Sequence, residues 1–388
     1  MKIYSLIKKM PLIRTIVRRF EAMECEIRNA QNELNRYKDK TRQEMKKYQE
    51  DMQKISREYK TNQREMEQKY QEQKKLIHQL EQKLAKSEFE LTNFKARYGR
   101  ERYQMKMDMR SNLYKALPEE RYEEELKNWY LLSTGKVLDL QHPKTYNEKM
   151  QWLKLYDHDK EKTRLSDKYL VRDFVKETIG EKYLVPLLGV WKCFDEIDFS
   201  TLPDKFVLKA NHGCGYNLIV KNKEELNFKE AKEKFDRWLT TNFAYVNFEM
   251  HYKDIHPVII AEEYIENEDD DLYDYKVWCF NGEPKYIMYL NNRKNGLKMV
   301  FYDTEWNRMP FTYSVAVCEE DIPKPDNLEE LLEMSKKLSK DFKHVRVDFY
   351  RLNDGSYKFG EMTFTSAAGK AIWHPEEYDR ILGDMLEL

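Results

Sequence analysis

The spacing of apolar residues divides the chain into two parts. Between Leu12 and Tyr98 there is no Pro or Gly, and good helix formers such as Glu, Lys, Gln, Arg and Met dominate. Apolar residues there recur mostly at steps of four and three, the heptad spacing of a coiled coil. The pattern predicts one long α-helical coiled coil over residues 21–110. Its seam includes Met23, Ile27, Ala30, Leu34, Tyr37, Met45, Tyr48, Met52, Ile55, Tyr59, Ile77, Leu80, Leu84, Leu91, Phe94 and Tyr98.

Polar residues interrupt this seam at Thr41, Asn62, Gln73 and Ser87, so the coiled coil is expected to be weak. At about 1.5 Å per residue, the helix would reach on the order of 130 Å, which is too long to stand unpaired. We therefore expect a homodimer formed through the coiled coil. The alternative is a single solvated helix that acts as a spacer.

Residues 1–20 contain Lys and Arg but no acidic residue, and apolar side chains are interleaved with the basic ones. A basic amphipathic segment of this kind is typical of contact with an anionic membrane surface. The alternative is a terminus that is disordered or that caps the coiled coil. No apolar run approaches the roughly 20 residues that span a bilayer. The sequence therefore predicts a cytoplasmic protein, with peripheral membrane contact through residues 1–20.

Gly, Pro and Trp return after about residue 110, which indicates a globular region. Residues 111–165 are predicted to form a helical cap, and residues 166–388 an α+β domain whose lid subdomain covers about 185–262. Apolar runs predict strands at Phe206 to Ala210, Asn217 to Lys221, Val258 to Tyr264, Tyr275 to Phe280, Lys285 to Leu290, Val345 to Tyr350 and Tyr357 to Thr363. A helix is expected from Leu328 to Lys340.

Composition narrows the class of protein. Of the 388 residues, 41% are hydrophobic and 35% are charged, which suits a globular domain joined to a solvated helix. The net charge of -1 gives no overall basic field, so nucleic acid is not expected as a partner. The five cysteines are scattered and form no CxxC pair, as in a reducing compartment without structural zinc.

The first candidate site is the segment FVLKANHGCGYNLIV, residues 206–220. A strand delivers Lys209, and Gly213 and Gly215 then loosen the turn into a second strand. Backbone amides and one ammonium arranged in this way can surround a phosphate group. The alternative is an ordinary β-hairpin that carries an incidental lysine.

The second candidate site is VRVDFYRLNDGSYKFGEMTF, residues 345–364, in which NDG predicts a hairpin turn. Because alternate residues share a face of a strand, Arg346 and Asp348 lie together, as do Glu361 and Thr363. Two carboxylates and a hydroxyl are oxygen ligands that suit Mg²⁺. The alternative is a cross-strand Arg–carboxylate salt bridge on a solvated sheet face.

The third candidate site follows the strand VIIAEEYI, where exposed backbone beside Glu262 could recognise an adenine edge. The acidic loop Glu268 to Asp271 lacks EF-hand spacing and is expected to be solvated surface. His212, Cys214, His251 and His256 have no metal-ligand spacing, so ordinary packing or loop roles are expected for them.

Taken in order, these motifs resemble those of the ATP-grasp superfamily, and from about residue 142 onward the chain is similar to the TupA-like (teichuronopeptide biosynthesis) ATP-grasp family. The segments that carry the resemblance are PKTYNEKMQWLKLYD, SDKYLVRDFV, YLVPLLGVW, LPDKFVLKANHG, IIAEEYI, DYKVWCFNGEPKYI, VRVDFY and FGEMTF. The resemblance implies an α+β ATP-grasp fold, preceded here by the long α-helical coiled coil.

The resemblance also implies roles for single residues. Lys168 and Lys209 would hold the α- and β-phosphates of ATP, beneath a lid loop that contains Gly213 and Gly215. Arg346 would steady the acyl phosphate. Adenine would meet Glu262 and the backbone of Tyr264 and Ile265, the ribose would meet Asp274, and Mg²⁺ would be ligated by Asp348, Glu361 and Thr363. Two residues depart from the superfamily pattern: Thr363 stands where Asn is usual, and Tyr216 where Gly is frequent in the lid loop.

The function that the resemblance implies is an ATP- and Mg²⁺-dependent ligase that joins a carboxylate to an amine through an acyl phosphate. The carboxylate would be a uronic acid or amino acid of a cell-surface polysaccharide or polypeptide. Two alternatives stay open: a degenerate ATP-grasp module whose coiled coil scaffolds a polysaccharide assembly complex, and a glycosyltransferase that acts on glycan.

Overall fold

The computed structural model describes residues 105–388, except 267–271, 292–296 and 314–315, together with scattered positions between 15 and 83. The chain forms two compact units, Met1–Gly99 and Arg100–Leu388. Within the first unit, residues 21–29 are helical, and Met23 and Ile27 are half-buried while the residues between them are exposed. Most of the predicted coiled coil, and nearly all of the basic segment 1–20, lie outside the described residues.

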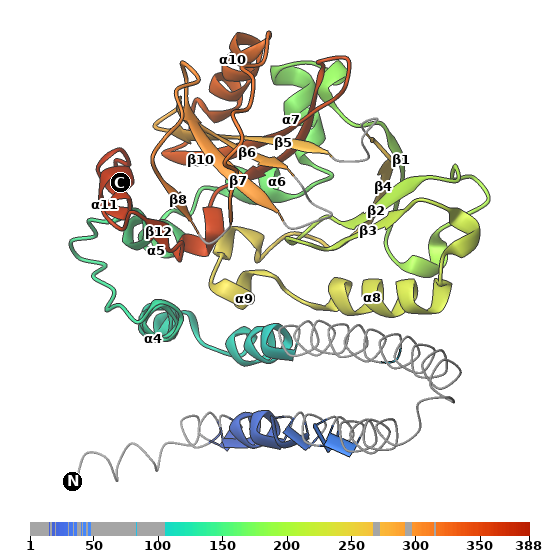
Figure 1. Cartoon of the computed structure of the whole chain (residues 1–388), viewed down its shortest axis with the longest axis vertical. Coiled ribbons are helices and arrows are strands. Elements are labelled where there is room, and N and C mark those ends of the chain that lie inside the picture. The colour runs from blue at the N-terminus through green and yellow to red at the C-terminus, as the bar shows by residue number, and fades with distance from the viewer. Residues whose placement is uncertain are drawn as a thin grey trace, which may run out of the picture. The chain divides into compact units, whose positions relative to one another are not determined.

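Along the chain of the second unit, helices come before the first strand, between strands and after the last strand (Figure 1). The first helix covers residues 105–115. It is followed by α4 (Tyr122–Thr134), α5 (Tyr146–Tyr156), α6 (Lys160–Ser166), α7 (Val171–Thr178), α8 (Phe228–Thr240), α9 (Ala244–Asn247), α10 (Leu328–Ser339) and α11 (Tyr378–Asp384). Among the described residues, no helix combines the length and the apolar character needed to cross a membrane.

The strands form a six-stranded, a four-stranded and a two-stranded sheet. The largest has the order β11 (Tyr357–Thr363), β10 (His344–Arg351), β5 (Tyr273–Phe280), β6 (Glu283–Asn291), β7 (Lys298–Asp303) and β9 (Ala316–Val317). The second has the order β1 (Leu187–Trp191), β4 (Ile259–Glu263), β2 (Phe206–Ala210) and β3 (Asn217–Val220), and the third pairs β12 (Trp373–His374) with β8 (Thr312–Tyr313). The mixture of helices and largely antiparallel sheets is the predicted α+β class.

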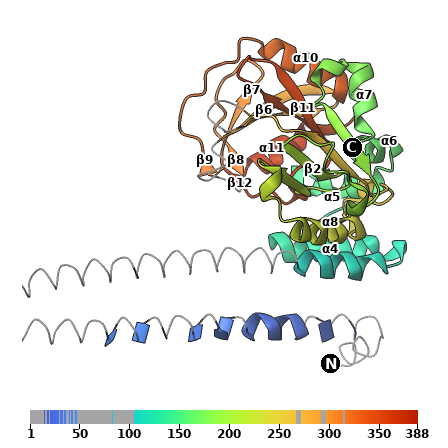
Figure 2. The ribbon, with the colours of Figure 1, turned by 90° about the vertical axis from the view of Figure 1, so that its right-hand side faces the viewer.

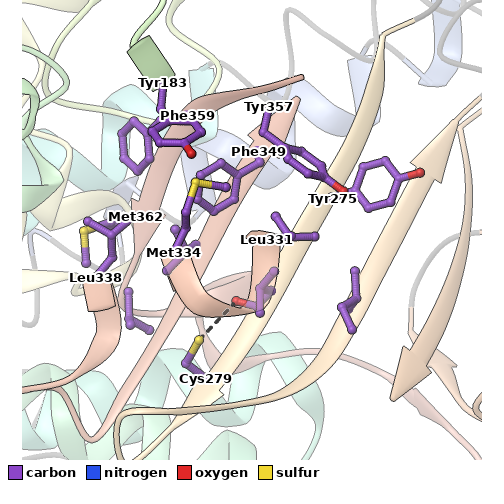
Figure 3. Close-up of a cluster of buried hydrophobic side chains, with 14 of the residues drawn as sticks. Tyr183, Tyr275, Cys279, Leu331, Met334, Leu338, Phe349, Tyr357, Phe359 and Met362 are labelled. Carbon is purple, nitrogen blue, oxygen red and sulfur yellow. Dashed lines mark hydrogen bonds between the residues drawn. The ribbon is translucent and has the colours of Figure 1, made fainter. Parts of the chain in front are cut away.

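Side chains alternate between the two faces of the large sheet, as the pleat requires. On β10, Val345, Val347 and Phe349 are buried in a cluster that also contains the apolar side of α10. Figure 3 shows this cluster, with Leu331, Met334 and Leu338 of α10 close to Phe349 and Met362 of the sheet. Arg346 and Asp348, at the intervening positions, therefore point to the opposite face.

That opposite face is covered at one end by α5 and α11, which lie away from α10 in both views (Figures 1 and 2). Tyr146 and Met150 of α5, and Leu382 of α11, pack there with Trp278 and other apolar side chains of the sheet. A capping box in which Thr145 and Glu148 exchange hydrogen bonds starts α5. The rest of this face carries charged residues and is where the candidate site lies.

The four-stranded sheet packs its buried side on α8 around a separate core that includes Phe206, Leu208 and Phe235. On β2, burial alternates, so Val207 and Lys209 lie on the other side of the strand. Helix 105–115 contributes to the same core through Met107.

Candidate active site

Three adjacent strands place charged residues in one row across the large sheet. In the register of β5, β10 and β11, Lys276 is opposite Asp348, and Asp348 is opposite Glu361. Two residues away, on the same face of the strands, Arg346 is opposite Thr363. Residues directly opposite on paired strands have Cβ atoms about 4.5–5.5 Å apart, so these side chains must interact. The predicted hairpin thus brings its two acids and its hydroxyl together.

Arg346 is the centre of this row. Its guanidinium donates to both oxygens of Asp348, at 2.7 and 2.8 Å, and also to Glu361 Oε1 at 3.3 Å and Thr363 Oγ1 at 3.0 Å. The Lys276 ammonium makes a further short hydrogen bond to Asp348. Both oxygens of Asp348 are therefore engaged, and its side chain is only 3% exposed.

Glu361 is the accessible acid of the row, because its side chain is 33% exposed. Burial favours the neutral form of its carboxyl group, but the positive charges of Lys168, Lys276 and Arg346 outweigh burial and lower its pKa to about 2. Glu361 is thus an anion at any physiological pH. A metal ion could share it with these cations.

Lys168 reaches this acid from the turn between α6 and α7. Its ammonium donates to the carbonyl oxygen of Gly213 at 2.7 Å and lies 3.9 Å from Glu361 Oε2. The turn is held in place because Asn211 donates to Asp167 at 2.8 Å, while the backbone nitrogen of Lys168 donates to the carbonyl oxygen of Asn211. The turn at residues 166–168 is therefore hydrogen-bonded to the start of the glycine loop, residues 211–216.

Lys209 lies on the site side of β2 and is paired with Glu262 at the end of β4. The ammonium is 2.5 Å from Glu262 Oε2, while Arg172 of α7 is 3.0 Å from Glu262 Oε1. Burial alone would lower the pKa of Lys209, but the charge and hydrogen bond of Glu262, together with Tyr350 and the charge of Glu361, raise it, so the lysine stays charged. Glu262, predicted to meet adenine, is nearly buried and forms ion pairs with both cations.

The glycine loop is packed against aromatic rings. Tyr216 stacks on Trp238 with ring centroids 5.2 Å apart and an interplanar angle of 14°. A Cβ atom at Gly213 would lie 2.7 Å from the Tyr216 ring, so only glycine fits there without a shift. Gly215 has φ +75, a conformation that favours glycine. Tyr216 therefore anchors the loop through its ring.

The remaining predicted residues lie around this centre. Asp274, predicted to meet the ribose, is buried on β5, and its carboxylate lies 3.8 Å from the Lys276 ammonium. Tyr264 and Ile265 follow the end of β4, where the Tyr264 ring lies within 5.7 Å of the Lys205 ammonium. His212 Nε2 lies 2.9 Å from the carbonyl oxygen of Trp238, a packing role. Among the described residues, no group of three or more His, Cys, Asp or Glu could hold a metal ion.

A cavity of about 620 Å³ opens beside the row. Cys214, Gly215 and Tyr216 of the glycine loop form one wall, and Arg346, Glu361 and Thr363 form another. Glu249 and residues of the segment that follows β11 also line the cavity. The size suits a small-molecule site, for which cavities of about 300–1,000 Å³ are typical.

Two cations of the site carry no predicted role. Lys276 is predicted only as part of a strand, and Arg172 only as part of a helix. The alternation in YDYKVW places Lys276 on the same face as Asp274, which was a usable signal. No local pattern links Arg172 to Glu262, because the two are 90 residues apart.

Comparison with known proteins gives the family. The sequence profile of TupA-like ATP-grasp proteins matches residues 148–387, well over half of the chain. The chain belongs to the TupA-like ATP-grasp family. The match begins within α5 and includes the six-stranded and four-stranded sheets. A search of curated proteins finds no match.

Solved structures similar to this TupA-like protein include an L-amino acid ligase from Bacillus licheniformis, with 15% identity and a TM-score of 0.38 over 58% of this chain and 50% of that one. A D-alanine–D-alanine ligase from Bacillus anthracis complexed with ATP has 18% identity and a TM-score of 0.36 over 57% and 65%. N5-carboxyaminoimidazole synthetase from Staphylococcus aureus has 14% identity and a TM-score of 0.30 over 52% and 44%. The chain thus spans less than two thirds of each.

Proposed function

We propose that this TupA-like protein is an ATP- and Mg²⁺-dependent ligase that activates a carboxylate as an acyl phosphate and joins it to an amine. The observation that carries the proposal is the row formed by Lys276, Asp348 and Glu361, with Lys168 and Lys209 facing it from the glycine-loop side. Phosphoryl transfer needs positioning and neutralisation of negative charge more than covalent chemistry. A site with this many cations supplies that neutralisation.

The donor set fits magnesium. Two carboxylates and a hydroxyl lie on one sheet face, and Mg²⁺ is usually held by one or two carboxylates together with water and phosphate oxygens. Glu361 is the more available ligand, while Asp348 would have to share its oxygens with Arg346 and Lys276. Thr363 offers a third oxygen. When bound, magnesium would neutralise charge on the phosphates.

The chain's own residues would divide the work. Lys168 and Lys209 would exchange their present partners, the Gly213 carbonyl oxygen and Glu262, for phosphate oxygens. The loop anchored by Tyr216 would cover the phosphates, and Arg346 would steady the acyl phosphate while the amine attacks its carbonyl carbon. Phosphate leaves as the amide bond forms. By family likeness, the product would belong to a cell-surface polysaccharide or teichuronopeptide.

The proposal is tested by calorimetric titration of the full-length chain with ATP in the presence of magnesium. Micromolar binding is expected for the wild type, with a loss of at least tenfold in Lys209→Ala and in Glu361→Ala. Lys285→Ala is the matched control, because Lys285 is exposed on β6. If the wild type does not bind ATP, the ligase proposal fails, and the scaffold alternative gains weight.

ATP binding alone does not establish ligation. The second step is to screen pairs of carboxylates and amines for ADP release by the full-length chain. Release that needs both partners supports the ligase. Turnover of a sugar nucleotide without ATP would instead support the glycosyltransferase alternative.

A further inference from the structure

The cavity beside the site has more polar and charged residues than the nucleotide and metal roles use. Besides Arg346, Glu361 and Thr363, its lining includes Asn247, Glu249, Thr365, Ala368 and Lys370. Thr365, Ala368 and Lys370 come from the segment that directly follows strand β11. The cavity thus carries a lysine to which neither role assigns a partner.

The charged side chains that line the cavity differ in whether they have a hydrogen-bonding or ionic partner. Arg346 and Glu361 contact each other. Glu249 accepts hydrogen bonds from Thr365 at 2.5 Å and from Asn247 at 3.3 Å. Among the residues that the structure describes, the Lys370 ammonium has no hydrogen-bond acceptor and no anion within ion-pair distance, and it lies 5.3 Å from the centroid of the Trp129 ring. Because Lys370 is only partly buried and lines the cavity, its ammonium is accessible to an anion that enters there.

The surroundings of Lys370 add positive potential. Lys154 lies over the same indole ring at 4.5 Å, and its ammonium donates only to neutral acceptors: Gln151 Oε1 and the carbonyl oxygens of Asn247 and Ala368. Burial, aided by the charge of Lys370, lowers the pKa of Lys154 to about 7, although Glu249 opposes this. Burial and then Arg110 likewise lower the pKa of Lys370. Each of these cations would be stabilised by an anion at Lys370.

We propose that Lys370 is a substrate anchor in this cavity that binds a carboxylate other than the one activated by ATP. This inference rests on the proposed ligase function and adds a requirement to it: one of the two substrates carries an additional acidic group. Lys154, over the same Trp129 ring, adds positive potential beside the anchor.

The test uses ligand-observed NMR on the full-length chain loaded with magnesium and a non-hydrolysable ATP analogue, AMP-PCP. The probes are pairs that differ in one carboxylate: L-glutamate and L-glutamine, L-aspartate and L-asparagine, glutarate and glutaramate. The carboxylate member of at least one pair should bind at least tenfold more tightly, as expected for a charged hydrogen bond of about 1.5–3 kcal/mol.

Substitutions of single lysines show which residue causes the preference for the carboxylate probe. Lys370→Gln should abolish the preference for the carboxylate member, Lys370→Arg should retain it, and Lys285→Gln, an exposed lysine outside the cavity, should leave it unchanged. The inference is overturned if no carboxylate probe binds, if both members of every pair bind equally, or if the preference survives in Lys370→Gln. Binding of AMP-PCP is measured in the same samples, so loss of the nucleotide site is recognised separately as failure of the ligase proposal.

Discussion

At the scale of single residues, Glu361 allows a pH test. Its folded-state pKa of about 2 is below the ordinary value of 4.5, so its ionised form stabilises the fold above pH 4.5 and that contribution is lost as the pH falls toward 2. At pH 7, Glu361→Gln should be less stable than the wild type, because Lys168, Lys276 and Arg346 lose an anion. Urea unfolding of both proteins between pH 7 and pH 3 should show this difference shrinking below about pH 4.5.

Asp354 provides the control for that comparison, because its side chain hydrogen-bonds Ser356 in the exposed turn far from the site cations. Asp354→Asn should show a smaller stability difference at pH 7 than Glu361→Gln. A stability difference for Glu361→Gln that stays constant from pH 7 to pH 3 would contradict the assignment of Glu361 as the carboxylate shared by these cations.

Gly213 gives a second prediction at this scale. In Gly213→Ala the new Cβ atom would lie 2.7 Å from the Tyr216 ring and 3.0 Å from Phe243, so the ring must leave its stack on Trp238. Overpacking of this kind typically costs about 1–3 kcal/mol of unfolding free energy. Guanidinium unfolding of the wild type and of Gly213→Ala measures this loss of unfolding free energy. The double variant with Tyr216→Ala should cost less than the sum of the two single variants, since the clash is then absent. Additive costs would show that Tyr216 does not hold the loop.

At the scale of elements, the β10–β11 hairpin could be predicted because its information is local. The alternation in VRVDFY assigns the faces, and the NDG turn, with Gly355 at φ +80, sets the pairing. The strands predicted at Phe206 to Ala210 and Tyr357 to Thr363 are confirmed as β2 and β11 with the same bounds. The others are confirmed within two residues at each end.

Other elements could not be predicted from the sequence, because they form only through contacts between segments that are distant in the chain. The strands β8, β9 and β12 are two residues long each and have no periodicity of their own. The pairing of Lys276 with Asp348 joins residues 72 positions apart and exists only because β5 lies beside β10. The role of Glu262 as a counter-ion likewise depends on α7 and β2 meeting at the end of β4. Sequence could find the acids of the site but not all of their partners.

The position of β5 makes Lys276 testable. Because Lys276 lies in the same row as Asp348 and Glu361, Lys276→Met should weaken binding of ATP with magnesium by about 10- to 100-fold, the range for a lost hydrogen bond to a charged group. Calorimetry on the full-length chain measures this, and Lys285→Met on the neighbouring strand β6 is the matched control. Unchanged affinity in Lys276→Met would restrict Lys276 to a structural role.

At the scale of the whole molecule, the second unit begins before the globular domain that composition suggested. Met107 is buried in the core of the four-stranded sheet, the Ser111 hydroxyl donates to the carbonyl oxygen of Asn242 at 3.2 Å, and the Tyr114 and Phe248 rings are 4.4 Å apart. Helix 105–115 thus belongs to this unit. A chain cut at residue 117 would expose the surfaces that this helix covers.

Truncation therefore gives a stability prediction. Residues 100–388 should fold alone, whereas residues 117–388 should unfold at a temperature lower by on the order of 10 °C, because two large buried side chains are lost. Differential scanning calorimetry compares the two. Equal unfolding temperatures would mean that helix 105–115 adds nothing to the stability of the unit.

The predicted homodimer belongs to the first unit, where Met23 and Ile27 are half-buried and the other side chains of the described helical residues 21–29 are exposed. If the heptad seam pairs two chains, sedimentation equilibrium should give a dimer for the full-length chain and a monomer for residues 100–388. A charge in the seam, Ile27→Glu, should shift the full-length chain toward monomer, whereas Glu26→Gln at an exposed position should not. A full-length monomer would leave the helical segment as a spacer, and each ATP-grasp domain would then act alone.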